Sequence, residues 1–145
     1  MTLDTQDRAD CAVLAALLAG QGALARWSLW LSALSLATLC LGPATGSSAL
    51  LLAAAALLGL PERYLVFRLR LDQRLFDALA TGRIPDLQTL DRSLAQTGLR
   101  AASANEPRPL DNRLHGTRRL LRRHAGIVAL QSLLLIAAVA ARLAS

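Results

Sequence analysis

The sequence contains few of the residues that build metal sites and cofactor sites. Among its 145 residues are two cysteines and two histidines, and all 16 basic residues are arginines, with no lysine. Two cysteines do not by themselves complete a four-ligand zinc site. His115 and His124 lie nine positions apart, which turns a helix by about 900°, so their side chains would point to opposite sides. We therefore expect no metal and no cofactor such as haem.

Aromatic residues and catalytic motifs are equally scarce. Aromatic residues make up 3% of the chain, and within the polar stretch 62–123 they are Tyr64, Phe67 and Phe76, all on the apolar face of a predicted helix. A protein that binds single-stranded nucleic acid uses aromatic side chains as stacking platforms for the bases. Neither a phosphate-binding glycine loop nor a nucleophile elbow occurs. We therefore expect no catalytic residues, no enzyme activity and no nucleic-acid binding.

Formal charge is missing from three stretches of the chain. Residues 27–41, 47–60 and 125–141 contain no Asp, Glu, Lys or Arg, and hydrophobic residues make up 54% of the whole sequence. As a helix, the third stretch would be about 25 Å long, which is enough to cross the hydrocarbon of a bilayer. The sequence therefore predicts an all-α membrane protein with three transmembrane helices, a hairpin plus one, and a cytoplasmic helical region between spans two and three.

Turn and breaker residues divide the chain further. The stretch 42–46, Gly-Pro-Ala-Thr-Gly, is typical of a tight turn, so spans one and two form an antiparallel hairpin. Residues 5–19 either lie in the membrane interface or lengthen span one, and their acidic start is unlike a cleavable secretory signal. Beyond span two we expect helices at 62–80 and 85–97, a linker at 100–109, and a helix that starts near Leu110 and can continue into span three. The predicted segments are 1–26 (cytoplasmic, with a possible interfacial helix), 27–61 (transmembrane hairpin), 62–123 (cytoplasmic, arginine-rich and helical) and 124–145 (third transmembrane helix and short tail).

The arginines predict the orientation. Fifteen of them lie in 1–26 and 62–123, one (Arg142) follows span three, and the 42–46 turn has none. Short loops rich in Arg stay on the cytoplasmic side of a membrane. The N-terminus is therefore expected in the cytoplasm and the C-terminus in the periplasm, with the chain in a bacterial inner membrane.

Contact with anionic lipid headgroups is expected at the cytoplasmic boundary. Four arginines directly precede the third charge-free stretch, and a charge at mid-bilayer costs about 2.5–3.5 kcal/mol on insertion scales, so they should stay at the headgroup level. Two tryptophans at the start of span one match the aromatic belt of membrane interfaces. His124 lies beside the arginines and is expected at the same boundary. The residues assigned to headgroup contact are Arg118, Arg119, Arg122, Arg123, Trp27 and Trp30.

Polar side chains within the spans are candidates for contact with a partner helix. Ser28, Ser32 and Ser35 fall on one face of span one. They either bond back to their own helix or form a seam along which another helix packs. Gln131 lies deep in span three and either bonds another helix or lines a path, which would normally need more polar residues.

An apolar stripe on the helix after span two is a second candidate contact surface. Tyr64, Phe67, Leu71 and Leu75 recur at spacings of three and four residues, which places them on one helical face. A short cytoplasmic region covers only part of such a face by itself. We therefore expect these residues to contact a partner protein or a second copy of the chain.

By elimination, the sequence favours a non-catalytic accessory, scaffold or assembly subunit of a membrane complex. One alternative is a component of a transporter or channel that works as a homo-oligomer. Another is a membrane-bound enzyme that uses the cytoplasmic arginines on a phosphorylated lipid.

The predicted orientation can be tested with a reporter that is active only in the periplasm. Fused after Ser145 it should be active, and fused after Gly98 it should be silent, because the arginine-rich segments stay in the cytoplasm. The opposite pattern of activities would contradict the orientation.

Overall fold

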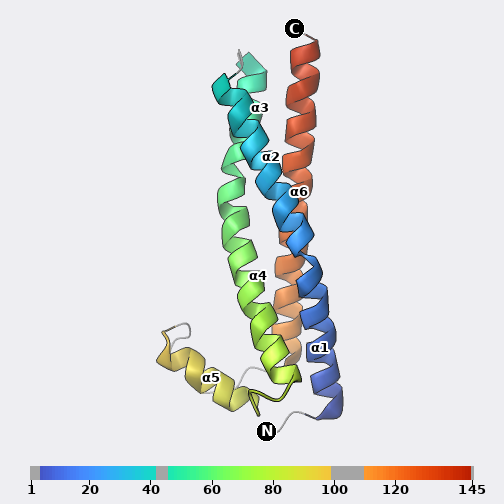
Figure 1. Cartoon of the computed structure of the whole chain (residues 1–145), viewed down its shortest axis with the longest axis vertical. Helices are drawn as coiled ribbons and strands as arrows, with labels where there is room; N and C mark the ends of the chain where they lie inside the picture. Colours follow the sequence, from blue (N-terminus) through green and yellow to red (C-terminus); the bar gives the residue numbers. More distant parts are fainter. Residues whose placement is uncertain (1–3, 42–45, 99–109, 145) are drawn as a thin grey trace. The chain divides into compact units, whose positions relative to one another are not determined.

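The computed structural model describes residues 4–41, 46–98 and 110–144. Within these ranges the chain forms α-helices and no strand (Figure 1), and 90% of the described residues are helical. The predicted 100–109 linker and most of the predicted 42–46 turn lie outside them. The helices are α1 (Thr5–Gly20), α2 (Gly22–Leu41), α3 (Gly46–Leu57), α4 (Gly59–Ala80), α5 (Leu87–Gln96) and α6 (Leu110–Leu143).

Three helical stretches are long and apolar enough to cross a membrane. They are Thr5–Leu41, Gly46–Ala80 and Leu110–Leu143, and each contains a window of strongly positive hydropathy with few charges. The prediction of an all-α, multi-pass membrane protein is therefore confirmed.

Two of these stretches are interrupted at a single residue. Gln21 alone separates α1 from α2, and Leu58 alone separates α3 from α4. The second break has a clear cause, since Pro61 has no N–H and its ring crowds the carbonyl of Leu57, four residues earlier. Hydrogen bonding resumes at once, with Glu62 N donating to Leu58 O at 3.3 Å. The helix expected from residue 62 therefore begins at Gly59.

Helix α6 is continuous over 34 residues. It joins the expected cytoplasmic helix from Leu110 to span three without a break at Gly116. At 1.5 Å per residue it is about 51 Å long, more than the hydrocarbon core of a bilayer. Only part of α6 therefore fits within the hydrocarbon core, and the charge-free residues 125–141 are the predicted part.

The described residues group into two compact units, each described here by itself. Unit 1 consists of Met1–Gly20 and Leu69–Arg119, and unit 2 of Gln21–Arg68 and Leu120–Ser145, so α4 and α6 contribute to both. The buried apolar side chains of unit 1 come from all four of its helical segments. They include Cys11, Leu14 and Leu18 of α1, Leu69, Phe76 and Leu79 of α4, Leu90 of α5 and Leu114 of α6.

Helix α5 is fixed at its start by Asp86 and to α6 by an ion pair. The Asp86 carboxylate accepts a hydrogen bond from Thr89 N at 2.7 Å, which lowers the pKa of Asp86 below its ordinary value. Asp91 forms an ion pair with Arg113 of α6. These contacts explain why a ten-residue helix, too short to be stable alone, is ordered.

Unit 2 brings α2, α3, the start of α4 and the second half of α6 together. In Figure 1, α2 and this part of α6 run in the same direction and α3 runs in the opposite one. On each element a series of buried residues recurs every seven positions, the spacing of helices that pack with a left-handed supercoil. They are Gln21, Ser28 and Ser35 before and on α2, Ser48, Ala55 and Glu62 on α3 and α4, and His124, Gln131 and Ala138 on α6.

The outward side chains of unit 2 are predominantly large and apolar. Trp30, Leu50 and Leu57 are exposed on α2 and α3, and Leu133 and Ile136 are exposed on α6. A water-soluble protein rarely shows so much contiguous apolar surface. Unit 2 thus exposes many large apolar side chains, as suits a bundle surrounded by lipid, and its interior contains polar residues among apolar ones.

Candidate functional site: polar layers within unit 2

Gln131 is the centre of a hydrogen-bonded layer that joins α2, α3 and α6. Ser28 Oγ donates to Gln131 Oε1 at 2.7 Å. Gln131 Nε2 donates to Ser32 Oγ and to the carbonyl oxygen of Ala55, both at 3.1 Å. The Gln131 side chain is fully buried, and both of its amide hydrogens are used. We call Ser28, Ala55 and Gln131 the glutamine layer.

Small residues make the close approach of the helices in this layer possible. Ala55 has no side-chain atom beyond Cβ, so Gln131 reaches the backbone of α3. Gly59 lies one turn further along, and a Cβ there would come within 2.5 Å of Ser32 Oγ. Small residues at helix contacts are characteristic of membrane bundles, where helices associate by tight packing and interhelical hydrogen bonds.

A second layer, seven residues away on each element, contains an acid and a base. His124 Nε2 lies 2.9 Å from Glu62 Oε1, and both side chains are fully buried. Arg63 Nε donates to Glu62 Oε2 at 2.7 Å, and Arg63 Nη2 donates to the carbonyl oxygen of Ala25 at 2.8 Å. A continuous chain of bonds therefore connects α2, α4 and α6. We call Gln21, Glu62 and His124 the acid–base layer, with Gln21 placed there by its seven-residue spacing from Ser28.

His124 faces Glu62 through its Nε2 atom. An ionised carboxylate only accepts hydrogen bonds, so Nε2 is the donor where Glu62 is ionised. His124 Nδ1 and Gln21 Oε1 are buried without a hydrogen-bond partner among the residues that the structure describes. Glu62 and His124 have no exposed surface, so their contact joins α4 to α6 within unit 2.

A third layer consists of Ser35, Ser48 and Ala138, each seven residues from its counterpart in the glutamine layer. Ser35 and Ala138 are fully buried and Ser48 nearly so. The Ser35 hydroxyl has no partner within the described part of the chain. The polar character of the bundle centre therefore continues along α2 but weakens along α6, where alanine replaces glutamine.

The structure brings Ser28, Ser32 and Gln131 together and leaves Ser35 outside their hydrogen bonds. Ser28 donates to α6 and not to its own helix, which is the behaviour of a packing seam. By contrast, Ser132 beside Gln131 bonds back to Val128 O at 3.0 Å. The contacts of these serines and of Gln131 lie within the chain itself.

The residues of the apolar stripe are not equally accessible. Tyr64 and Phe67 belong to unit 2, and 62% and 68% of their surfaces are exposed. Leu71 and Leu75 belong to unit 1 and are half-buried. Contact with a partner remains a prediction for all four residues. Tyr64 and Phe67 have the largest exposed fractions of the four.

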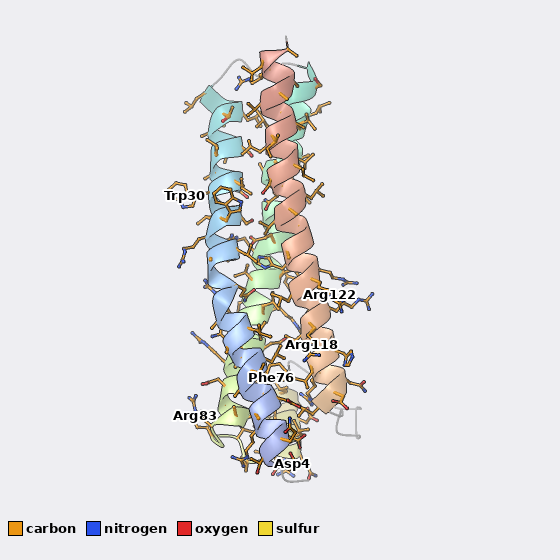
Figure 2. All side chains as sticks on the ribbon, turned by 90° about the vertical axis from the view of Figure 1, so that its right-hand side faces the viewer. Asp4, Trp30, Phe76, Arg83, Arg118 and Arg122 are labelled. Carbon is orange, nitrogen blue, oxygen red and sulfur yellow. The ribbon has the colours of Figure 1, made fainter. Side chains whose placement is uncertain are left out.

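The residues assigned to headgroup contact are all exposed. Arg118, Arg119, Arg122 and Arg123 lie on the exposed side of α6, and Figure 2 shows Arg122 pointing away from that helix. None of the four has an ion-pair partner among the described residues. Trp30 is 71% exposed, and Trp27 also reaches α6, since its Nε1 donates to Ser132 Oγ at 3.4 Å.

The aspartates of unit 1 have structural partners. Asp72 accepts from Thr117 Oγ1 at 3.0 Å and Asp91 pairs with Arg113, so both connect to α6. Asp77 pairs with Arg83. Across residues 4–41, 46–98 and 110–144, no three His, Cys, Asp or Glu side chains are placed to hold a metal ion.

The acid–base layer is the part of the site that is hardest to see in the sequence. Glu62 follows a proline at the end of an apolar run, and His124 sits among arginines, so both resemble residues of a membrane boundary. The signal that identifies them is the spacing: Glu62 lies seven residues after Ala55, and His124 lies seven residues before Gln131.

The chain matches no protein-family model, and comparisons with curated proteins and with solved structures found no similar chain. Its function has to be inferred from its own residues.

The close approach at Gly59 gives a test of the packing in unit 2. In Gly59→Ala the new Cβ would lie 2.5 Å from Ser32 Oγ, so Ser32 must move and its bond to Gln131 is lost. We expect the free energy of unfolding in detergent to fall by about 1–3 kcal/mol, the usual effect of overpacking.

Gly126→Ala is the matched control, because nothing lies within 4 Å of a Cβ at that position of α6. It should be neutral or slightly stabilising, since alanine favours a helix more than glycine does. Adding Ser32→Ala to Gly59→Ala should recover part of the loss. Equal stability of Gly59→Ala and Gly126→Ala would show that the helices are not packed as described.

Proposed function

We propose that the protein is a non-catalytic accessory, scaffold or assembly subunit of a complex in a bacterial inner membrane. The observation that carries this proposal is the use of the buried polar groups. Gln131, Glu62 and His124 have no exposed surface and bond to neighbouring helices of their own bundle. Such groups stabilise a bundle and are not placed to act on a substrate.

The orientation that we propose has the N-terminus in the cytoplasm and the C-terminus in the periplasm. In unit 2, Arg26, Arg63, Arg68, Arg122 and Arg123 come from α2, α4 and α6, and the one acidic residue, Glu62, is buried. This excess of positive charge suits the anionic lipid headgroups of the cytoplasmic leaflet. The exposed arginines of α6, together with Trp27 and Trp30, are the residues proposed to contact them.

The proposed partner is a helix of another membrane protein that docks on Tyr64 and Phe67. These aromatic side chains are exposed and flanked by Arg63 and Arg68, so the surface combines apolar area with positive charge. Aromatic residues and arginine are enriched among the residues that contribute most to protein interfaces. A partner with an apolar helix face and acidic residues at its cytoplasmic end would complement this surface.

The geometry gives less support to the two alternatives. A transport path needs polar groups that can bind and release a substrate, whereas both amide hydrogens of Gln131 are already used. An enzyme acting on a phosphorylated lipid would need an acid or base that reaches the substrate. The buried histidine, His124, has no such access.

The partnered state can be tested by purifying the chain in mild detergent and measuring the mass of the complex. We expect a stoichiometric complex with one membrane protein. Phe67→Arg should abolish that complex while the chain remains inserted and abundant, because it places an additional charge in the apolar contact.

Leu143→Arg is the control, since it adds the same charge at a highly exposed position of α6. It should leave the complex intact. A chain that purifies alone would contradict the proposal, and one that forms only a homo-oligomer would favour the transporter or channel alternative.

A further inference from the structure

The apolar residues of the bundle do not define a unique position for α6 along its partners. The buried apolar positions of α6 in unit 2 are Val128 and Ala138, and those of α2 and α3 include Ala25 and Leu52. Helices rich in alanine and leucine present similar surfaces in successive turns. Sliding α6 by seven residues would bring the same face to the same neighbours, about 10.5 Å further along.

Within unit 2, neither the short sequence link between α2 and α3 nor the exposed arginines of α6 remove this ambiguity. Only four residues of the sequence separate α2 from α3, whereas residues 81–109, including α5, separate α4 from α6. The long side chains of arginine can extend along a helix to keep the charge at the headgroup level, so they tolerate displacement of the helix. The arginines therefore set the depth of α6 in the membrane only loosely.

The same displacement would break the hydrogen bonds of the polar layers. In the observed register, His124 meets Glu62 and Gln131 meets Ser28, and the two pairs belong to successive layers. Displacement by seven residues in one direction would bring His124 level with Ala55 and leave Glu62 without a basic partner on α6. In the other direction, Gln131 would replace His124 beside Glu62.

We propose that the Glu62–His124 and Ser28–Gln131 contacts select the register in which α6 packs against α2, α3 and α4. In coiled coils, a single buried polar residue fixes register and partner number in the same way, because displacement leaves it unsatisfied. For Gln131 and Ser28, which lie within the predicted spans, a membrane would provide no water to bond the displaced groups. The polar contacts therefore select the register, and apolar packing holds the helices together.

The register can be read from disulfide formation between engineered cysteines. Ala25 and Val128 are both buried and lie three residues before Ser28 and Gln131, so Ala25→Cys with Val128→Cys reports the observed register. Ala25→Cys paired with Leu121→Cys or Leu135→Cys reports displacement by seven residues in either direction. All three pairs are placed in the full chain carrying Cys11→Ala and Cys40→Ala, and oxidised in native membranes.

With the polar residues intact, the 25–128 disulfide should form and the other two should stay near background. Replacing Glu62, His124 and Gln131 together with leucine should leave the protein inserted, because apolar residues of similar volume often substitute for buried polar groups. The ratio of the 25–128 product to the displaced products should then fall by at least about tenfold, equivalent to 1.4 kcal/mol. Thr117 and Arg113, which bond unit 1 residues, are unchanged throughout.

The matched control replaces three lipid-facing residues of α6, Leu130, Leu133 and Ile136, with alanine, and it should keep the 25–128 disulfide alone. The proposal is overturned if the leucine variant also forms only that disulfide. It is equally overturned if the leucine variant fails to insert or accumulate, since the polar residues would then be needed for stability itself.

Discussion

Inside a bilayer no water is available to bond a polar side chain, so each such group must find its partner within protein. This constraint governs the arrangement of unit 2. In a lone transmembrane helix the amide of Gln131 would lack hydrogen-bond partners, but here it bonds Ser28, Ser32 and the backbone of Ala55. The alanine and the serines are small because a larger side chain would keep α6 from approaching. The glycine at 59 follows from the same requirement, since even a methyl group would meet Ser32 Oγ.

A buried charged group likewise needs partners within the protein, and the acid–base layer provides them. Glu62 carries a carboxylate into a fully buried position, where it is tolerated because His124 and Arg63 both bond it. A group held so completely is poorly suited to binding and releasing a substrate. The buried polar residues of unit 2 bond neighbouring helices, and the exposed arginines and aromatic residues are the ones proposed to contact lipid headgroups and a partner. This division is the basis of the proposed scaffold or assembly role.

Much of the fold follows from simple patterns in the sequence. Three charge-free stretches predict the membrane helices, and the apolar periodicity from Leu110 predicts a helix that continues into span three, as α6 does. The pairing of Glu62 with His124 does not follow as readily, because 62 positions separate them and the proline and arginines beside them suggest a membrane boundary. Their relation can be recognised only from the seven-residue spacing. Seven residues after Ala55 is Glu62, beyond Pro61, and seven residues before Gln131 is His124, next to Arg123. The sequence pattern also places Tyr64, Leu71 and Leu75 in one stripe, but in the structure Tyr64 is exposed and the two leucines are half-buried. The pattern does not distinguish them, because burial depends on which neighbouring helices cover each part of the stripe.

The central claim is that Glu62 and His124 act as a pair that joins α4 to α6, and a double-mutant cycle measures this directly. The free energy of unfolding would be determined in lipid nanodiscs for the wild type, Glu62→Leu, His124→Leu and the double variant. Glu62→Leu should destabilise the protein by about 3–5 kcal/mol, because it leaves both His124 and Arg63 without their partner. His124→Leu should cost less, since Glu62 keeps Arg63, and the double change should cost less than the sum of the two. Strictly additive losses would contradict the account, since they would mean that the two side chains contribute independently and that no buried pair connects the helices.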